Sequence, residues 1–145
     1  MNPYLSIIVP VYNDEGIISA SLEKIESGLK EWRSKGYEIL VVNDGSYDET
    51  EKVVKDYSRR NPSFPLRLLS FDKNHGKGFA VAKGMLAATG KFRFFSDSDL
   101  STPLTYLKPC IDALEGNADV VAASRFSAGS KILVDRSPWI RFLSL

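Results

Sequence analysis

Short apolar runs alternate with longer amphipathic stretches along this chain. Leu5–Val11 is nearly continuously apolar and rich in β-branched residues, a pattern that predicts a strand covered on both faces. Apolar residues then recur at helical spacing over about residues 17–32, and Gly36 marks the expected stop. Similar apolar runs predict four further strands, at residues 38–42, 66–71, 91–95 and 119–123.

A helical pattern lies between each pair of predicted strands. Ser46 or Asp48 is expected to cap the second helix, and Pro103 suits the first turn of the fourth. Strands that alternate with helices imply right-handed crossovers and a largely parallel sheet. The sequence therefore predicts an α/β protein in which five strands alternate with four helices.

Composition adds few constraints to this pattern. The chain has 145 residues, which suits one domain or a large piece of a bigger one. Hydrophobic residues make up 43% and charged residues 26%, as in soluble globular proteins. The formal net charge is +1, so nothing in the charge balance indicates a nucleic-acid partner.

The chain has a single cysteine, Cys110, which cannot form an internal disulfide, so a reducing, cytoplasmic environment is expected. The N-terminus does not resemble a secretory signal. No apolar run approaches the roughly 20 residues that span a bilayer. Any membrane contact is therefore expected to be peripheral or to lie beyond residue 145.

Two carboxylates, Asp97 and Asp99, follow the predicted strand at residues 91–95. Carboxylates this close repel each other, and a hard divalent cation such as Mg²⁺ or Mn²⁺ would neutralise them while binding a substrate diphosphate. The small Ser98 between them leaves room for that diphosphate. The alternative is that Asp99 or Ser101 only caps the helix that begins near Pro103.

Polar residues also end the first two predicted strands. Asp44 could accept hydrogen bonds from a nucleobase or ribose beside the flexible Gly45, although residues 43–46 (NDGS) also suit a plain turn. Asn13, Asp14 and Glu15 could cap the following helix, while Pro10 and Tyr12 could present backbone and ring to a base. A nucleotidyltransferase would carry a glycine-rich basic loop directly after the first strand. The acidic loop found there argues against a nucleotidyltransferase.

Two basic residues are placed to bind phosphate. Gly76 and Lys77 precede a predicted helix N-terminus, which favours anions. Arg125 follows the predicted fifth strand and could clamp a phosphate or form a salt bridge. His75 is the only histidine, which makes a zinc cluster unfavourable and leaves this residue a structural or supporting role.

These motifs together resemble the family-2 glycosyltransferases of the GT-A fold, a Rossmann-like α/β/α sandwich. The resemblance rests on residues 7–13 with Glu15, residues 42–46 with Asp48 and Thr50, and residues 97–99. Residues 73–81, 84–85, 97–103, 124–125 and 136–137 are similar to the dolichyl-phosphate β-glucosyltransferase branch, whose neighbours are the dolichyl-phosphate mannose synthases. This chain departs from the branch at Ser98, where alanine is more common.

The resemblance implies a metal-dependent, inverting transfer of a hexose from a nucleotide diphosphate sugar, with UDP-glucose favoured, to a polyprenyl or dolichyl phosphate. Asp97 and Asp99 would bind the Mg²⁺ or Mn²⁺, and both are expected to be catalytic together with Arg125. The expected nucleotide-sugar-binding residues are Pro10, Tyr12, Asn13, Glu15, Asp44, Gly45, Gly76, Lys77, Asp97 and Ser98. The alternatives are a sugar-hydroxyl acceptor, or a fragment that binds the nucleotide sugar without catalysis.

The same resemblance divides the chain in two. Residues 1–125 are expected to form the donor-binding core, and residues 126–145 to begin an acceptor-side or membrane-proximal segment. The family's domain normally continues well past residue 145, so the chain is expected to be truncated. Residues 131–145 could lie on a membrane surface, at the cytoplasmic face in the full-length protein, or form an ordinary packed helix.

Overall fold

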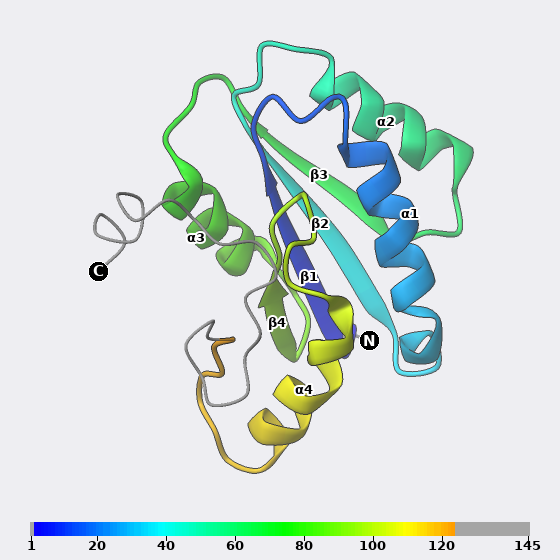
Figure 1. Ribbon diagram of the computed structural model, residues 1–145, viewed down its shortest axis with the longest axis vertical. Coiled ribbons are helices and arrows are strands. Elements are labelled where there is room, and N and C mark those ends of the chain that lie inside the picture. Colours follow the sequence, from blue (N-terminus) through cyan, green and yellow to red (C-terminus); the bar gives the residue numbers. More distant parts are fainter. Residues whose placement is uncertain (1, 124–145) are drawn as a thin grey trace, which may run out of the picture.

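A computed structural model describes residues 2–123 of the chain, and these residues form a four-stranded parallel sheet with helices on both faces (Figure 1). The strand order is β3-β2-β1-β4, so β1 lies inside the sheet between β2 and β4. The strands are β1 (Leu5–Val11), β2 (Tyr37–Asp44), β3 (Leu66–Phe71) and β4 (Phe92–Phe95). The first four predicted strands are therefore confirmed within one or two residues.

The helices are confirmed as well, with the first and fourth each divided in two. They are α1 (Ile18–Gly28), the 3-10 turn η1 (Lys30–Trp32), α2 (Thr50–Arg60), α3 (Lys77–Ala87), the 3-10 turn η2 (Leu104–Tyr106) and α4 (Leu107–Glu115). Helices α1, α2 and α4 pack on one face of the sheet, while α3 packs on the other. Pro103 directly precedes η2, close to its expected place.

The core has two layers because alternate residues of β1 point to opposite faces. Leu5, Ile7 and Val9 belong to the larger apolar cluster beneath α1, α2 and α4. Ile8 belongs to a smaller cluster on the α3 face, which also contains Val42. All residues of β1 and β2 are buried, as their continuous apolar patterns predict for inner strands.

The predicted fifth strand, residues 119–123, is wrong. No strand forms there, although these residues lie within the described part of the chain. Val120 is 84% exposed and Val121 is 36% exposed, so the apolar side chains are not covered by packing. A strand requires a hydrogen-bonded partner, and an apolar run in the sequence does not reveal whether a partner is present.

A buried carboxylate, Glu38, lies at the start of β2. Its oxygens accept hydrogen bonds from the hydroxyl of Ser6 (2.7 Å), the guanidinium of Arg67 (2.7 Å) and both the backbone and hydroxyl of Thr89 (2.6 and 2.8 Å). Burial raises the pKa of Glu38, but these hydrogen bonds outweigh burial and lower it to about 2. The apolar pattern of residues 38–42 predicts a buried strand and gives Glu38 no separate role.

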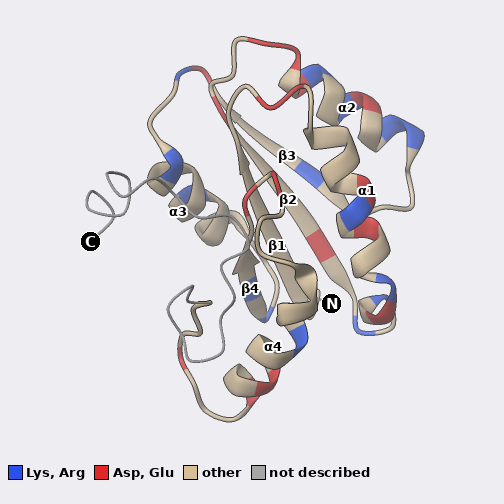
Figure 2. Ribbon diagram, in the orientation of Figure 1, with Lys and Arg blue, Asp and Glu red and all other residues tan. Residues whose placement is uncertain are grey.

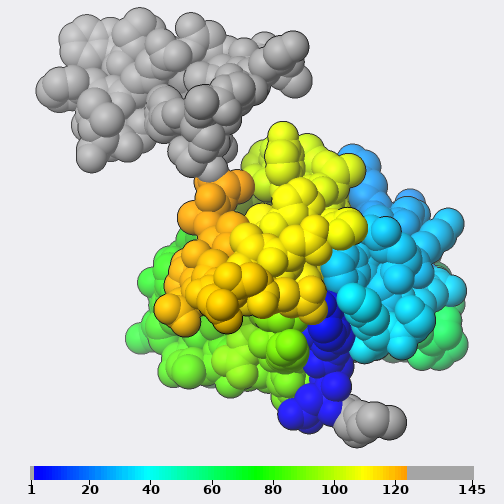
Figure 3. Space-filling view, turned by 90° about the horizontal axis from the view of Figure 1, so that it is seen from below, coloured from blue at the N-terminus to red at the C-terminus, as the bar shows by residue number. Residues whose placement is uncertain are grey.

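Helix α4 closes the end of the molecule opposite the strand-end loops. The yellow segment that contains α4 lies beside the blue N-terminal strand and the cyan segment that leads into β2 (Figure 3). A small cavity of about 160 Å³ separates α4 from η1, lined by Trp32 and Ile111 among others. Cys110 of α4 is partly buried, and burial raises the pKa of its thiol.

No helix within residues 2–123 combines the length and the apolar composition needed to cross a bilayer. Ser124, Arg125 and the segment 126–145 lie outside the described residues, as does the proposed boundary between donor core and acceptor-side segment.

Candidate active site

The strand order places a ligand site between the carboxyl ends of β1 and β4. The chain runs outward from β1 to β2 and β3 on one side, then returns across the α3 face to β4 on the other side. In open parallel sheets, ligands bind in the crevice at this reversal of strand order. The loops after β1 and β4 lie at this edge, and they contain Tyr12 and Asp97 respectively.

Hydrogen bonds join the loop after β1 to the loop after β2. The backbone N–H of Asn13 donates to the Ser46 hydroxyl at 2.9 Å, and the Asn13 side-chain oxygen accepts from the Tyr47 N–H at 3.0 Å. The N–H of Asp14 donates to the Thr50 hydroxyl at 2.8 Å. Asn13 therefore uses its side chain to align two loops, a contact that its expected donor-binding role did not include.

Glu15 extends this connection to helix α2. Its carboxylate accepts a 2.8 Å hydrogen bond from the N–H of Glu49, which directly precedes α2. Asp48 accepts from the N–H groups of Thr50 (3.0 Å) and Glu15 (3.2 Å). Burial raises the pKa of Asp48, but these hydrogen bonds lower it overall. Asp48 thus accepts a hydrogen bond from the first residue of α2, but the N-cap residue is Glu49, which makes no side-chain cap hydrogen bond, and Ser46 binds Asn13 instead.

An aromatic surface borders the same loops. Pro10 is buried within β1, and Tyr12, just after the strand, is 44% exposed. The Tyr12 ring meets Tyr47 edge to face, with ring centroids 6.2 Å apart, and Tyr47 is 85% exposed. Exposed rings of this kind can stack against a planar base.

Asp44 is buried at the end of β2 and holds the loop after β3. Its carboxylate accepts hydrogen bonds from the backbone N–H groups of His75 (3.0 and 3.1 Å) and Gly76 (2.7 Å). The His75 ring nitrogen Nδ1 lies 3.5 Å from Asp44 Oδ1, and the ring stacks on Phe79 with centroids 4.3 Å apart. This loop-holding role could not be predicted from the sequence, because the partners are more than 30 positions apart.

Gly45 allows the loop after β2 to contact the loop after β3. Its φ is +72°, and a Cβ atom there would lie 2.2 Å from the carbonyl carbon of Lys73. Gly76 also has a positive φ, +96°, and directly precedes α3. Both glycines therefore serve the backbone path that places Lys77 at the start of α3.

Lys77 and Asp97 form an ion pair across the strand-end edge. The Ser96 N–H donates to the Ile8 carbonyl at 3.0 Å, which continues the sheet ladder and holds Asp97 beside β1. Lys77 Nζ lies 2.5 Å from Asp97 Oδ1. That oxygen is buried yet accepts no hydrogen bond of good geometry from the described residues, so the ion pair is its main interaction.

Asp99 takes part in the turn that follows. It is exposed, and its Oδ1 accepts a 2.9 Å hydrogen bond from the Ser101 N–H. Leu100 between them has a φ of +52°. Asp99 therefore holds the turn before η2 with one carboxylate oxygen, but it does not cap that helix, whose N-cap residue is Pro103 and which has no side-chain cap hydrogen bond.

The two carboxylates suit a hard divalent cation. Within residues 2–123 there is no group of three histidine, cysteine, aspartate or glutamate side chains that could enclose a metal ion. Mg²⁺ and Mn²⁺ sites do not require such an enclosure, because water and substrate phosphates complete their oxygen shell. The buried Asp97 oxygen, whose main interaction among the described residues is the ion pair with Lys77, fits this donor set.

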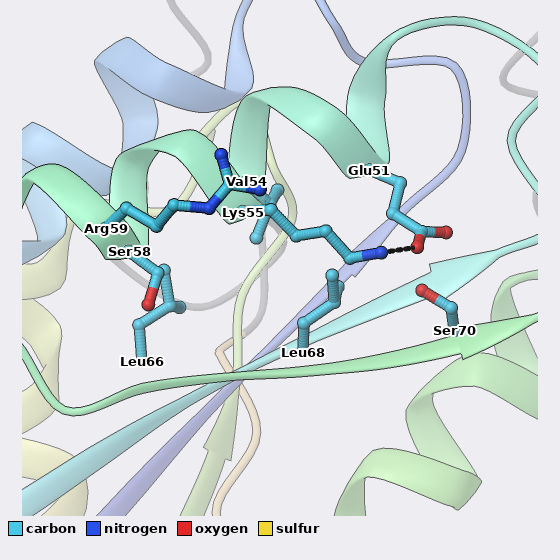
Figure 4. Close-up of a pocket in the computed structure, with 8 residues that line it drawn as sticks. All are labelled: Glu51, Val54, Lys55, Ser58, Arg59, Leu66, Leu68 and Ser70. Atoms are coloured by element: carbon cyan, nitrogen blue, oxygen red, sulfur yellow. Dashed lines mark hydrogen bonds and ion pairs between the residues drawn. The ribbon is translucent and has the colours of Figure 1, made fainter.

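Charge is divided across this edge of the molecule. Acidic residues mark the loops after β1, β2 and β4, whereas basic residues mark the start of α3 (Figure 2). A separate cavity of about 510 Å³ lies between α2 and the outer strand β3, where Lys55 pairs with Glu51 (Figure 4). None of the expected site residues lines that cavity, so the strand-end edge remains the candidate site.

Comparison with known proteins gives the family of this chain. The sequence model for glycosyl transferase family 2 matches residues 6–143, nearly the whole chain. The chain belongs to glycosyl transferase family 2. Two similar curated proteins are the dolichyl-phosphate beta-glucosyltransferases of Dictyostelium discoideum (33% identical, covering 97% of this chain and 45% of that protein) and Drosophila melanogaster (39% identical, covering 77% and 34%).

Solved structures place the family-2 chain in the GT-A fold. The mannosyltransferase PcManGT from Pyrobaculum calidifontis, in complex with GDP-Man and Mn²⁺, superimposes with a TM-score of 0.68 at 28% identity, over 79% of this chain and 33% of that one. Glucosyl-3-phosphoglycerate synthase from Mycobacterium tuberculosis gives 0.59 at 25% identity, over 77% and 39%. The chain spans less than half the length of these relatives.

Proposed function

We propose that this chain supplies the donor-binding half of a glycosyltransferase. The enzyme would transfer a hexose from a nucleotide diphosphate sugar, with UDP-glucose as the favoured donor. The observation that carries the proposal is the placement of Asp97 and Asp99 at the reversal of strand order, with Asp97 facing Lys77. A diphosphate needs positive charge beside it, and this edge combines a lysine with two carboxylates suited to a divalent cation.

The nucleoside would lie over the loops after β1 and β2. Pro10 near the end of β1, with Tyr12, Asn13 and Glu15 after it, would form one side of the nucleoside site. Asp44, the last residue of β2, and Gly45 would form the other. Tyr12 offers an exposed ring for the base. Gly76, Lys77 and Ser98 would surround the diphosphate. The small residues Gly76 and Ser98 would let it approach the backbone closely, and Lys77 would pair with its charge.

Asp97 and Asp99 would hold Mg²⁺ or Mn²⁺, which would supply Lewis-acid stabilisation to the leaving diphosphate. Lys77 would neutralise the same developing charge with its ammonium group. Arg125, which lies outside the described residues, is proposed to add a second positive charge. The metal proposal is supported by the PcManGT complex, which holds Mn²⁺ with its nucleotide sugar.

The acceptor is proposed to be a polyprenyl or dolichyl phosphate, since similar proteins are named dolichyl-phosphate beta-glucosyltransferases. A phosphate oxygen would bond to the anomeric carbon as the bond from that carbon to the diphosphate breaks, inverting the configuration. The acceptor is already an anion, so no general base is required. A lipid acceptor would bring the reaction to a membrane surface, which we place on the cytoplasmic side.

Calorimetric titration with a panel of UDP- and GDP-sugars, with and without Mn²⁺, tests this proposal. We expect one UDP-sugar to bind in the presence of Mn²⁺, and Asp97→Asn and Asp99→Asn to weaken that binding at least tenfold. Asp72→Asn, which changes an exposed carboxylate in the loop after β3, is the matched control. An affinity for the nucleotide sugar that changes neither with Mn²⁺ nor with the two substitutions would overturn the metal assignment.

A further inference from the structure

Lys77 pairs with one oxygen of Asp97, a carboxylate proposed to bind the metal ion. Lys77 Nζ lies 2.5 Å from Asp97 Oδ1, and that oxygen accepts no well-aligned hydrogen bond from any described residue. The Asp97 side chain is 37% exposed and that of Lys77 is 59% exposed, so the pair lies at the surface of the crevice. A tethered ammonium group therefore neutralises Asp97 when no ligand is present.

The backbone of Lys77 is fixed, but its side chain has room to move. The preceding residue, Gly76, donates its N–H to the buried carboxylate of Asp44 at 2.7 Å. Lys77 is the first residue of α3, and its flexible four-carbon stem is largely exposed. The ammonium group can therefore leave Asp97 without disturbing the helix or the loop that precedes it.

The Lys77 ammonium opposes the binding of a divalent ion at Asp97, because two cations held close to the same carboxylate repel each other. A divalent ion that approaches alone therefore binds more weakly while Lys77 stays paired with Asp97. A nucleotide diphosphate changes this balance, because its oxygens offer Lys77 another anion at the N-terminus of α3. On this basis, which rests on the proposed function, we propose that Lys77 exchanges Asp97 for the donor diphosphate, so that metal and nucleotide bind cooperatively.

The affinity for Mn²⁺, measured from the electron paramagnetic resonance signal of the free ion, tests the exchange without any catalytic turnover. We expect Lys77→Met to bind Mn²⁺ alone about three- to fivefold more tightly, in keeping with the loss of a partly exposed ion pair. We also expect UDP to strengthen Mn²⁺ binding several-fold less in Lys77→Met than in the unchanged chain. Lys77→Arg, which keeps the charge, should retain the coupling.

The matched control is Lys108→Met, because Lys108 pairs with Asp112 on the exposed face of α4, away from the site. It should behave as the unchanged chain does. Unaltered Mn²⁺ affinity and unaltered coupling in Lys77→Met would overturn the exchange, provided that Asp97→Asn weakens Mn²⁺ binding. If Asp97→Asn leaves Mn²⁺ binding unchanged, the proposed metal site itself is wrong, so the two failures are distinguishable.

Discussion

The carboxylate of Asp44, at the end of β2, accepts a 2.7 Å hydrogen bond from the backbone N–H of Gly76, at the start of α3. The same carboxylate accepts from the N–H of His75. Because Lys77 follows Gly76 directly, Asp44 sets the position from which Lys77 reaches Asp97. One buried side chain thereby connects the loop expected to bind the nucleoside with the residues expected to bind the diphosphate.

Asp44→Asn should loosen the loop after β3. An asparagine keeps one acceptor oxygen but loses the charge and places an NH₂ group against backbone donors, so we expect a loss of about 1–3 kcal/mol in the free energy of unfolding. The amides of His75 and Gly76 should exchange with deuterium faster in the ligand-free protein. Hydrogen–deuterium exchange of the segment 72–79, together with urea unfolding, measures both effects.

Asp72→Asn is the control for this prediction, since Asp72 is an exposed carboxylate in the same loop. Its exchange and stability should match those of the unchanged chain. Unchanged exchange in Asp44→Asn would contradict the loop-holding role and leave Asp44 as a ligand contact only.

Two glycines of α3 should respond to alanine in opposite directions. A Cβ at Gly84 would lie 2.4 Å from Ile8 Cγ2 and 2.9 Å from Val42 Cγ2, because α3 packs closely on the sheet there. Overpacking of this kind costs about 1–3 kcal/mol, so Gly84→Ala should lower the free energy of unfolding. A Cβ at Gly78 meets nothing within 4 Å, so Gly78→Ala should be stabilising by about 0.5 kcal/mol.

Thermal or urea unfolding of both variants checks this pair. The same chemical change is made in the same helix, so helix propensity affects both and only the packing against β1 and β2 differs. Similar stabilities for Gly84→Ala and Gly78→Ala would mean that α3 does not approach the sheet as closely as described.

All four strands of the sheet could be predicted from their apolar runs. β1 and β2 are continuous apolar runs, and every residue in them is buried. Residues 119–123 show a similar run, but Val120 is 84% exposed and no described strand pairs with it. The local sequence pattern shows only where apolar residues occur, whereas a strand also depends on pairing with another strand that is distant in the sequence.

The sequence could predict where the candidate site residues lie in the fold, but not the contacts that they make. Parallel strands bring their carboxyl ends to one edge, so the clusters around Asp44 and Asp97 could be placed there from the order of elements alone. That Asp44 binds the backbone at His75, and that Glu15 binds the backbone at Glu49, depends on loop geometry. Such side-chain-to-backbone bonds place no demand on the partner's residue type and so leave no signal in the sequence.

Glu38 should make stability depend on acid pH. Its pKa falls from an ordinary value of 4.5 to about 2 in the folded protein, so the folded state holds the proton less tightly than the unfolded state. The stabilisation is therefore fully present above about pH 4.5 and is lost as the pH falls through 2. It amounts to about 3 kcal/mol.

Urea unfolding of the unchanged chain and Glu38→Gln between pH 2 and pH 7 measures this contribution. The difference in free energy of unfolding should be largest at neutral pH and should shrink toward pH 2. Glu23→Gln, a change at an exposed position of α1, should show little difference across the range. A difference for Glu38→Gln that stays constant with pH would contradict the lowered pKa.

Asp97→Asn should affect stability far less than Asp44→Asn does. Asp44 is buried and hydrogen-bonded to two backbone N–H groups, whereas Asp97 has a partly exposed ion pair as its main interaction. Such pairs contribute less than about 1 kcal/mol, and the substitution also removes a charge from a shielded oxygen, so the ligand-free stability should change by no more than that. Urea unfolding in the absence of metal measures it. A loss as large as that of Asp44→Asn would show that Asp97 holds the fold rather than a ligand.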